Sequence, residues 1–247
     1  MIEDIWTVMW KEWHEYAAGG GSGRGRGLIG VLIIIGIVSI LLPFQLVRQG
    51  NSWVDSPLPV LIDGVYLPFT ILLNVIADSF AGERERHTLE TLLASRLSER
   101  AILFGKVGAA TAYGLVLALI AAALQLVVAN LAGGFGFYPA GTIIAIVVLG
   151  LLFSLLAASA GCLISLRAPT TRQAQQILGI GFMVLIFVPI ILIQLLPASA
   201  QAQILTWLNT TAPGTIFALL VAGLVLLDAI LLAIARLRFQ RAQLIGS

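Results

Sequence analysis

Hydrophobic residues along the 247-residue chain gather into six long runs, which short polar or glycine-rich stretches separate. Each run is close to the length of about 20 residues that crosses a hydrocarbon core of about 30 Å as a helix. Backbone polar groups in lipid need partners within their own segment, so each run is expected to be helical. The predicted spans are residues 28–47, 59–80, 103–131, 141–166, 177–196 and 215–235. The pattern predicts an all-α polytopic membrane protein with six transmembrane helices and one transmembrane domain over residues 1–247.

Two shorter amphipathic stretches lie outside these runs. Near the start of the chain, apolar residues recur at helical spacing beside several aromatic residues, which predicts an interfacial helix within residues 1–18. A linker of glycine and arginine follows at residues 19–27. Residues 201–209 predict a short helix on the outer side of the membrane, just before the last span.

The composition supports the membrane class and narrows the chemistry. Hydrophobic residues make up 59% of the chain and charged residues only 11%, whereas soluble domains are about 25% charged. The single cysteine, Cys162, excludes an internal disulfide. Both histidines, His14 and His87, lie outside the apolar runs, which argues against a histidine metal site within the membrane.

Basic residues indicate how the chain is oriented. If the N-terminus is cytoplasmic, all of the 14 lysines and arginines except Arg48 fall on the cytoplasmic side. Cytoplasmic loops of membrane proteins carry this excess of positive charge. We therefore expect a multi-pass protein of the cell (plasma) membrane, with a six-helix bundle over residues 28–235, a tail at residues 236–247 and both termini in the cytoplasm.

The charge-dense connection at residues 81–100 departs from a plain helix bundle. Leu89, Leu92, Leu93 and Leu97 repeat at helical spacing and would form one apolar stripe. Charged residues surround the start of the stripe, and Ser98 is placed to cap the next helix. Two alternatives remain open: this helix lies on the bilayer or on its own bundle, or it docks into a partner's groove. In the second case a moving partner would displace the second and third spans together.

The stretch 80–106, FAGERERHTLETLLASRLSERAILFGK, closely resembles the signature of type-2 ABC transporter membrane subunits. In that family it reads roughly G-E-R-E-x-G-T-L-E-x-L-L-x-x-P-[LI]-S-[RK]-x-x-[IL]-x-x-x-K. The stretch 5–15, IWTVMWKEWHE, resembles the elbow helix that precedes the family's first span, and the six-span layout is similar. Three features depart from the pattern: His87 replaces a glycine, Arg96 replaces a proline, and the linker at residues 19–27 is unusual.

The resemblance implies the permease subunit of an ABC exporter that works by alternating access, with a coupling helix at residues 83–93 seated on a separate ATPase. The residues that would couple to the ATPase are Glu83, Arg84, Glu85, Thr88, Leu89, Glu90, Leu92 and Leu93. No G-x-x-x-x-G-K-[ST] sequence is present, so ATP and magnesium would be bound by the partner chain and this chain would need no cofactor or metal of its own. Two-fold symmetry favours a second permease copy in the assembly. The expected partners are therefore ABC ATPase subunits, a second copy and the lipid bilayer, with no nucleic acid.

Polar residues within the spans are the remaining candidates for function. Charged residues inside a membrane are costly and often mark a path or gate, so Asp228 in the last span is a candidate gate. Asn74 and Gln125 add polarity that would line a path or join helices. An ion-coupled carrier or channel without an ATPase is the main alternative function. A carrier of that kind usually has charged pairs or broken helices at mid-membrane, and here only Asp228 comes near this pattern.

Overall fold

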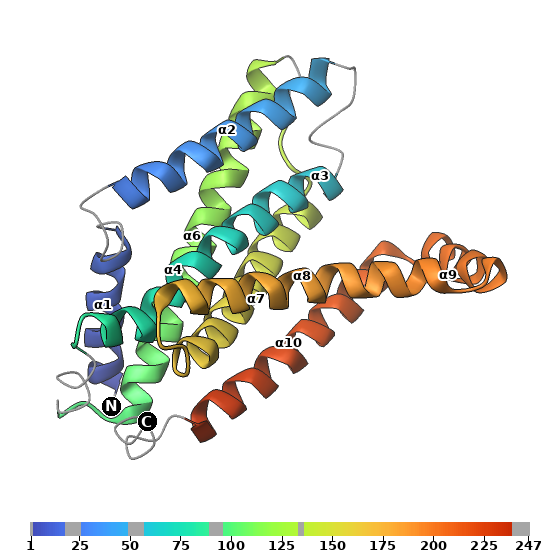
Figure 1. The fold of residues 1–247 in the computed structure, drawn as a ribbon. Helices are drawn as coiled ribbons and strands as arrows, with labels where there is room; N and C mark the ends of the chain where they lie inside the picture. The colour runs from blue at the N-terminus through green and yellow to red at the C-terminus, as the bar shows by residue number, and fades with distance from the viewer. Residues whose placement is uncertain (1, 18–25, 49–56, 89–95, 133–135, 239–247) are drawn as a thin grey trace.

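The computed structural model describes residues 2–17, 26–48, 57–88, 96–132 and 136–238. All regular structure among these residues is helical, which confirms the predicted all-α class (Figure 1). The elements are α1 (Ile2–Ala17), α2 (Arg26–Arg48), α3 (Pro57–Leu61), the π-helix η1 (Ile62–Tyr66), α4 (Leu67–Glu85), α6 (Glu99–Leu131), α7 (Ala140–Ser165), α8 (Thr171–Leu195), α9 (Ala198–Thr210) and α10 (Pro213–Arg238).

Five helical stretches in the described part of the chain are long and apolar enough to cross a membrane. They are Pro59–Glu85, Glu99–Leu131, Ala140–Ser165, Thr171–Leu195 and Pro213–Arg238. The first predicted span corresponds to α2, which has 23 residues, and its described apolar part, Ile35–Arg48, is shorter than a membrane span. A multi-pass helical protein is therefore confirmed, while the count of six spans stays a prediction.

The centre of the molecule is formed by α4, α6 and α7, which pack against one another. Three large side chains of α4 are fully buried in this core: Leu72, Ile76 and Phe80, each with 0% exposure. Gly161 on α7 lies directly against Ile76, and a Cβ atom there would collide with the Ile76 side chain. A glycine at this position therefore lets the backbones of α4 and α7 approach closely, as small residues do in membrane bundles.

The helices α8 and α10 diverge from this core and meet again through α9, so that an arm projects to one side (Figure 1). α10 packs along α7, and α8 packs against α4. In the most apolar 18-residue stretch of each of these two helices, only 6% of the residues are buried. Most of their surface is therefore free for lipid or another protein. The short helix predicted at residues 201–209 is confirmed as α9.

The N-terminal helix predicted from the sequence is confirmed as α1, and it packs lengthwise along the first half of α6. Val8 is buried against Gly105 of α6, and Tyr16 packs on Tyr113 farther along the same helix. Trp6 and Trp10, on the opposite side, are more than half exposed. The axis of α1 thus follows the bundle, which differs from a helix lying flat across its end.

Candidate coupling site

The end of α4 is a hydrogen-bonded turn that interrupts the expected coupling helix. The Thr88 N–H donates to the Glu83 carbonyl at 2.9 Å, and the His87 N–H donates to the Arg84 carbonyl at 3.1 Å. This pair of bonds is the Schellman motif, in which the residue after the C-cap takes a left-handed conformation and is usually glycine. His87 has a φ of 57°. Residues 83–85 therefore form the last turn of α4, and the expectation of one continuous helix over residues 83–93 is wrong at its start.

A buried ion-pair cluster joins this turn to α1 and α6. The Lys106 Nζ atom on α6 lies 2.7 Å from Oε1 of Glu12 on α1 and 3.0 Å from Oε1 of Glu83 on α4. It also donates to the Ser79 carbonyl at 3.0 Å. Lys106, Glu12 and Glu83 are 1%, 2% and 5% exposed. Because an unpaired buried charge costs several kcal/mol, the cluster holds the three helices together at one point.

Lys11 on α1 completes the cluster at its half-exposed rim. Its Nζ atom lies 3.4 Å from Oε1 of Glu83, 3.6 Å from Oε1 of Glu12 and 3.2 Å from Oε1 of Glu15. Burial lowers the pKa of Lys11 and the Lys106 charge adds to this, but the surrounding carboxylates outweigh both, so the pKa lies above its usual 10.5. Two lysines therefore face the two buried carboxylates, and their charges balance.

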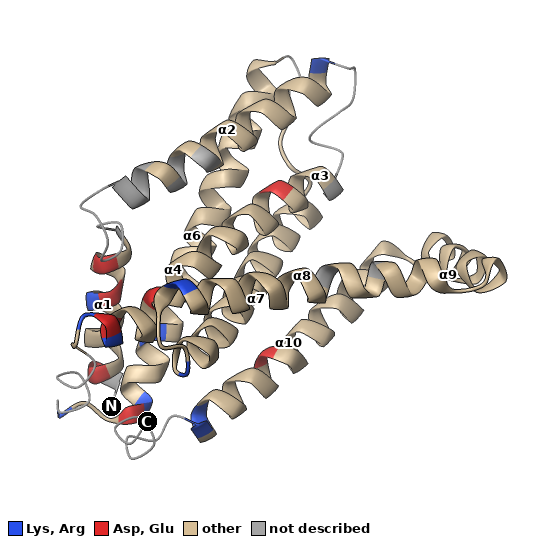
Figure 2. Ribbon diagram, viewed as in Figure 1, with Lys and Arg blue, Asp and Glu red and all other residues tan. Residues whose placement is uncertain are grey.

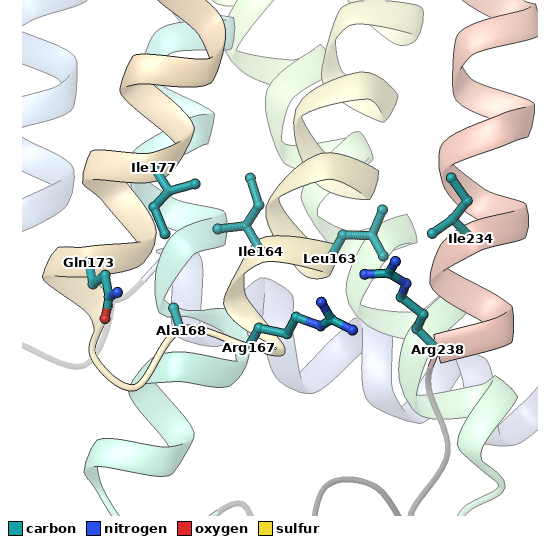
Figure 3. A pocket seen from close by; sticks show the side chains of 8 residues that line it. All are labelled: Leu163, Ile164, Arg167, Ala168, Gln173, Ile177, Ile234 and Arg238. Atoms are coloured by element: carbon teal, nitrogen blue, oxygen red, sulfur yellow. The ribbon is translucent and has the colours of Figure 1, made fainter. Parts of the chain in front are cut away.

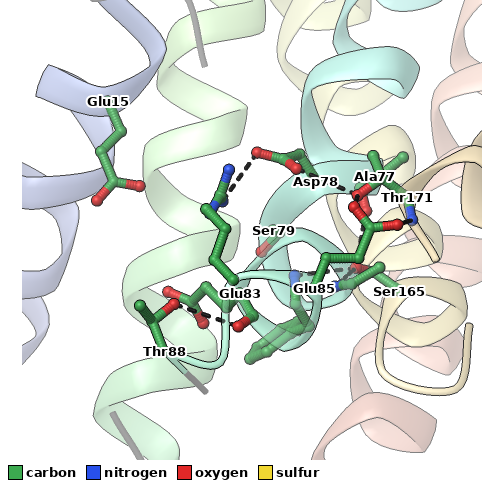
Figure 4. Close-up of polar contacts among 12 residues, drawn as sticks. Glu15, Ala77, Asp78, Ser79, Glu83, Glu85, Thr88, Ser165 and Thr171 are labelled. Carbon is green, nitrogen blue, oxygen red and sulfur yellow. Dashed lines mark hydrogen bonds and ion pairs between the residues drawn. The ribbon is translucent and has the colours of Figure 1, made fainter. Parts of the chain in front are cut away.

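A second set of contacts ties the end of α4 to the connection between α7 and α8 (Figure 4). The Arg84 guanidinium donates to the carbonyls of Ala168 at 2.6 Å and Leu166 at 2.8 Å. The Glu85 carboxylate accepts from the backbone N–H of Thr171 at 2.9 Å and from its hydroxyl at 3.1 Å. Thr171 begins α8, where a carboxylate is favoured by the helix dipole.

Ser165, the last residue of α7, extends the same junction into the backbone of α4 (Figure 4). Its hydroxyl accepts from the N–H groups of Phe80 at 2.9 Å and Ala81 at 2.8 Å. The same hydroxyl donates to the Ala77 carbonyl at 2.9 Å. One side chain therefore joins two helices through three hydrogen bonds, and the end of α4 is fixed from the side of α7 as well as from α1 and α6.

The predicted coupling residues divide into two groups in the structure. Glu83 is buried and Arg84 is partly buried, whereas Glu85 and Thr88 are exposed although both hydrogen-bond to their own chain. Leu89, Glu90, Leu92 and Leu93 lie outside the described residues. Beyond them, Ser98 caps α6 by accepting from the Ala101 N–H at 3.2 Å, as predicted. The structure thus defines both ends of the segment at residues 81–100, and its role in binding a partner stays a prediction.

The three candidate path residues lie on three different helices. Asp228 on α10 is 2% exposed, and neither of its carboxylate oxygens has a hydrogen-bond partner among the described residues. Asn74 is exposed on α4 and donates to the Thr70 carbonyl of its own helix at 3.0 Å. Gln125 is fully buried on α6. No hydrogen bond between described residues joins the three, and the assignment of a path to them stays a prediction.

Gln125 instead lies beside the π-helix η1. A Cβ atom on Gly64 would be 3.5 Å from Nε2 of Gln125. Asp63 on η1 is 2% exposed, and Ser39 on α2 is also buried. The side-chain polar atoms of both residues, like those of Gln125, have no hydrogen-bond partner among the described residues. Short π-helices often occur at functional positions, and buried polar groups are normally satisfied. This polar patch between α2, η1 and α6 is therefore an exception within the apolar core.

Five residues of the junction are not among the candidates predicted from the sequence: Lys11, Glu12, Lys106, Ser165 and Thr171. The first three could have been proposed, since the Lys-Glu pair of the elbow stretch and the final lysine of the loop signature are both part of the resemblance. The roles of Ser165 and Thr171 depend on contacts with residues more than 80 positions away, which no local pattern records.

These features define a multi-pass membrane protein whose charged loop is anchored to both neighbouring parts of the bundle. The family model described as ABC-2 family transporter protein matches residues 64–235. The chain belongs to this family, and it is therefore the membrane subunit of an ABC transporter. Comparison with curated proteins gives no match.

Proposed function

We propose that the chain is the permease subunit of an ABC exporter and moves its substrate outward by alternating access. A separate ATPase chain binds and hydrolyses ATP with magnesium, and it docks on the segment at residues 81–100. The complete transporter contains two permease copies and two ATPases, since two-fold symmetry is the usual closure of such assemblies. It resides in the plasma membrane with both termini in the cytoplasm.

The observation that carries this proposal is the anchoring of the loop. Glu83 at its start contacts Lys106 of α6, which also binds Glu12 of α1. The neighbouring Arg84 and Glu85 bind the connection between α7 and α8. A partner that displaced the loop would therefore move α1, α4, α6 and the start of α8 as one unit. Such a junction suits the transmission of ATP-driven motion into the membrane.

The charge distribution supports the proposed orientation. The basic residues of the described helices gather at one end of the bundle, where α1 and the ends of α4 and α10 lie (Figure 2). The end of α2, whose last residue is Arg48, lies at the opposite end of the bundle. The positive-inside rule assigns the basic end to the cytoplasm. The coupling segment then faces the compartment in which an ATPase and its nucleotide are found.

The test is purification of the tagged chain from its native membrane in mild detergent, followed by mass spectrometry of the proteins that accompany it. We expect an ATPase with a Walker motif to accompany the wild-type chain. The Leu92→Lys variant, which places a charge in the leucine stripe, should lower the ATPase yield by about tenfold, as for an interface hot spot. Leu205→Lys on α9, an exposed leucine at the far end of the molecule, is the matched control and should leave the yield unchanged.

Two results would contradict the proposal. A wild-type chain that emerges without any ATPase would favour the ion-coupled carrier, and Asp228 would then be the first residue to mutate. Equal ATPase yields from the wild-type and Leu92→Lys chains would show that the ATPase does not dock on the leucine stripe of the loop. The direction of transport is tested separately: with ATP on the cytoplasmic face, an exporter accumulates substrate in inside-out vesicles and removes it from right-side-out vesicles.

A further inference from the structure

A groove opens at the basic end of the bundle, between the end of α7, the start of α8 and the end of α10 (Figure 3). Its volume is about 570 Å³, within the range of small-molecule sites. The wall of the groove is mostly apolar. It is formed by Leu163, Ile164, Ala168, Ile177 and Ile234, together with the polar residue Gln173. The remaining lining residues are two arginines, Arg167 and Arg238.

The two arginines point towards one another across the mouth of the groove, Arg167 from the end of α7 and Arg238 from the end of α10 (Figure 3). Both are exposed. Within the described residues neither guanidinium has a hydrogen-bond or ion-pair partner. The only carboxylate on α10, Asp228, is ten residues from Arg238 and so about 15 Å farther along the helix. Among the described residues, the two positive charges at the mouth of the groove therefore have no ion-pair partner.

The walls determine what kind of anion fits. The helices that border the groove are all among those long and apolar enough to cross a membrane, so its apolar wall continues into the hydrocarbon layer. Guanidinium groups bind phosphate through paired hydrogen bonds. Basic pockets between transmembrane helices on the cytoplasmic side are typical places for anionic lipid head groups. A molecule with a phosphate at one end and hydrocarbon at the other matches both parts of the groove.

We propose that this groove binds an anionic phospholipid. The phosphate lies between Arg167 and Arg238, and an acyl chain follows Ile164, Ile177 and Ile234 towards the bilayer. The bound lipid fills the groove between the end of α7, the start of α8 and the end of α10. The site rests on the membrane-spanning character of the chain and is independent of the proposed direction of transport and of the ATPase partner.

The experiment compares lipid binding to the purified full-length chain by native mass spectrometry in detergent. The probes are dioleoyl phosphatidylglycerol, which is anionic, and dioleoyl phosphatidylcholine, which has the same chains and no net charge. We expect the wild-type chain to retain phosphatidylglycerol preferentially. The Arg167→Gln/Arg238→Gln variant should bind it about 25-fold more weakly, at about fivefold for each arginine removed.

Two further variants separate the groove from general surface charge. Arg172→Gln/Arg236→Gln removes the same charge from two exposed arginines that do not line the groove, and it should bind phosphatidylglycerol like the wild type. Ile177→Trp keeps both arginines but fills the groove, and it should lose the lipid. Thermal unfolding of each variant in detergent checks that the fold is intact, which we expect because all five side chains are exposed.

Three results would overturn the proposal. The first is equal loss of lipid in the two arginine pairs, which would indicate non-specific attraction. The second is unchanged binding in the Arg167→Gln/Arg238→Gln variant. The third concerns a free anion: if inorganic phosphate at the same concentration displaces phosphatidylglycerol from the wild-type chain, the groove is an anion site without a role for the acyl chains.

Discussion

At the scale of single residues, His87 is the most informative position of the candidate site. It occupies a left-handed backbone conformation, with a φ of 57°, at the place where the resembling family has glycine. A residue with a Cβ atom is disfavoured there by about 1 kcal/mol. We expect His87→Gly to raise the thermal stability of the detergent-solubilised chain by up to about 1 kcal/mol. His87→Ala is the control and should give no gain, since it keeps the Cβ atom; an equal gain would implicate the imidazole instead of the backbone.

Lys106 is the residue on which the buried cluster depends. Lys106→Met keeps the length of the side chain but leaves the carboxylates of Glu12 and Glu83 buried without their main cation. Removal of one partner from a buried ion pair costs about 3–5 kcal/mol. We expect a loss of this size in thermal unfolding, together with faster proteolysis near α1. The triple change Lys106→Met/Glu12→Leu/Glu83→Gln should recover most of the loss, because no unpaired charge remains; failure to recover would show that the charges themselves are required.

Single residues also differ in how far their roles can be predicted from the sequence. Ser98 was predicted to cap the helix after the loop because its signal is local, and the structure confirms it. The hydropathy pattern predicts that the second span ends at residue 80 and that Glu83 and Glu85 belong to a separate coupling helix. Both lie in the last turn of α4 instead, where partners from distant segments, Lys106 and Thr171, bind their carboxylates. That compensation arises only after the helices pack.

At the scale of elements, the docking of α1 on α6 depends on glycine. A Cβ atom on Gly105 would lie 2.6 Å from the Val8 side chain and 3.2 Å from the Ile5 carbonyl, whereas one on Gly108 would meet the flexible Met9 side chain at 3.1 Å. We expect Gly105→Ala to weaken the docking of α1 by about 1–3 kcal/mol, as overpacking does. Gly108→Ala is the matched control and should be tolerated. Protease sensitivity of α1 measures the difference, and equal behaviour of the two variants would contradict the close approach at Gly105.

The buried Tyr16, which packs on Tyr113 of α6, makes the docking of α1 sensitive to alkaline pH. Burial raises the pKa of Tyr16 well above its usual 10.0, and the nearby Glu12 carboxylate adds to the shift. A group whose pKa is raised by folding stabilises the folded state below its unfolded pKa and loses this contribution as pH rises through the folded pKa. The Lys11 pKa is also raised, and its contribution falls in the same direction. We therefore expect α1 to become accessible to protease above about pH 10, and Tyr16→Phe to reduce this loss. Unchanged accessibility up to pH 12 would contradict the burial of the phenol.

The elements themselves were largely predictable. Long apolar runs predict the membrane-spanning helices, because in lipid the backbone N–H and C=O groups of a single segment can all be hydrogen-bonded only in a helix. The path of α1 along α6 was not predictable, since Gly105 fits packing between spans equally well in the sequence. The sequence predicts Gln125 as a polar candidate but not its grouping with Ser39 and Asp63, because the three residues come from α2, η1 and α6 and share no sequence pattern.

At the scale of the whole molecule, Arg84 links the two halves of the junction. Its guanidinium holds the carbonyls of Leu166 and Ala168 at the end of α7. In the proposed complex we expect nucleotide binding to change hydrogen exchange in the first turn of α8, and Arg84→Ala to abolish this change while the ATPase stays bound. Arg86→Ala, which removes an exposed pair with Asp78, is the control and should keep the change. Loss of the response in both variants would show that the link through Arg84 is not specific.

The length of α6 determines how far from the bilayer a partner would meet this subunit. Its 33 residues span about 50 Å, whereas the hydrocarbon core is about 30 Å thick. About 20 Å of the helix is therefore left over, close to the length of about 24 Å for the 16 residues of α1 that lie along its first half. In the proposed complex, α1 would stiffen this part of α6 and hold its first turn away from the lipid head groups. An ATPase docked there would have room to rotate without displacing lipid. A shorter α6 would remove this room even if every residue that contacts the ATPase were kept.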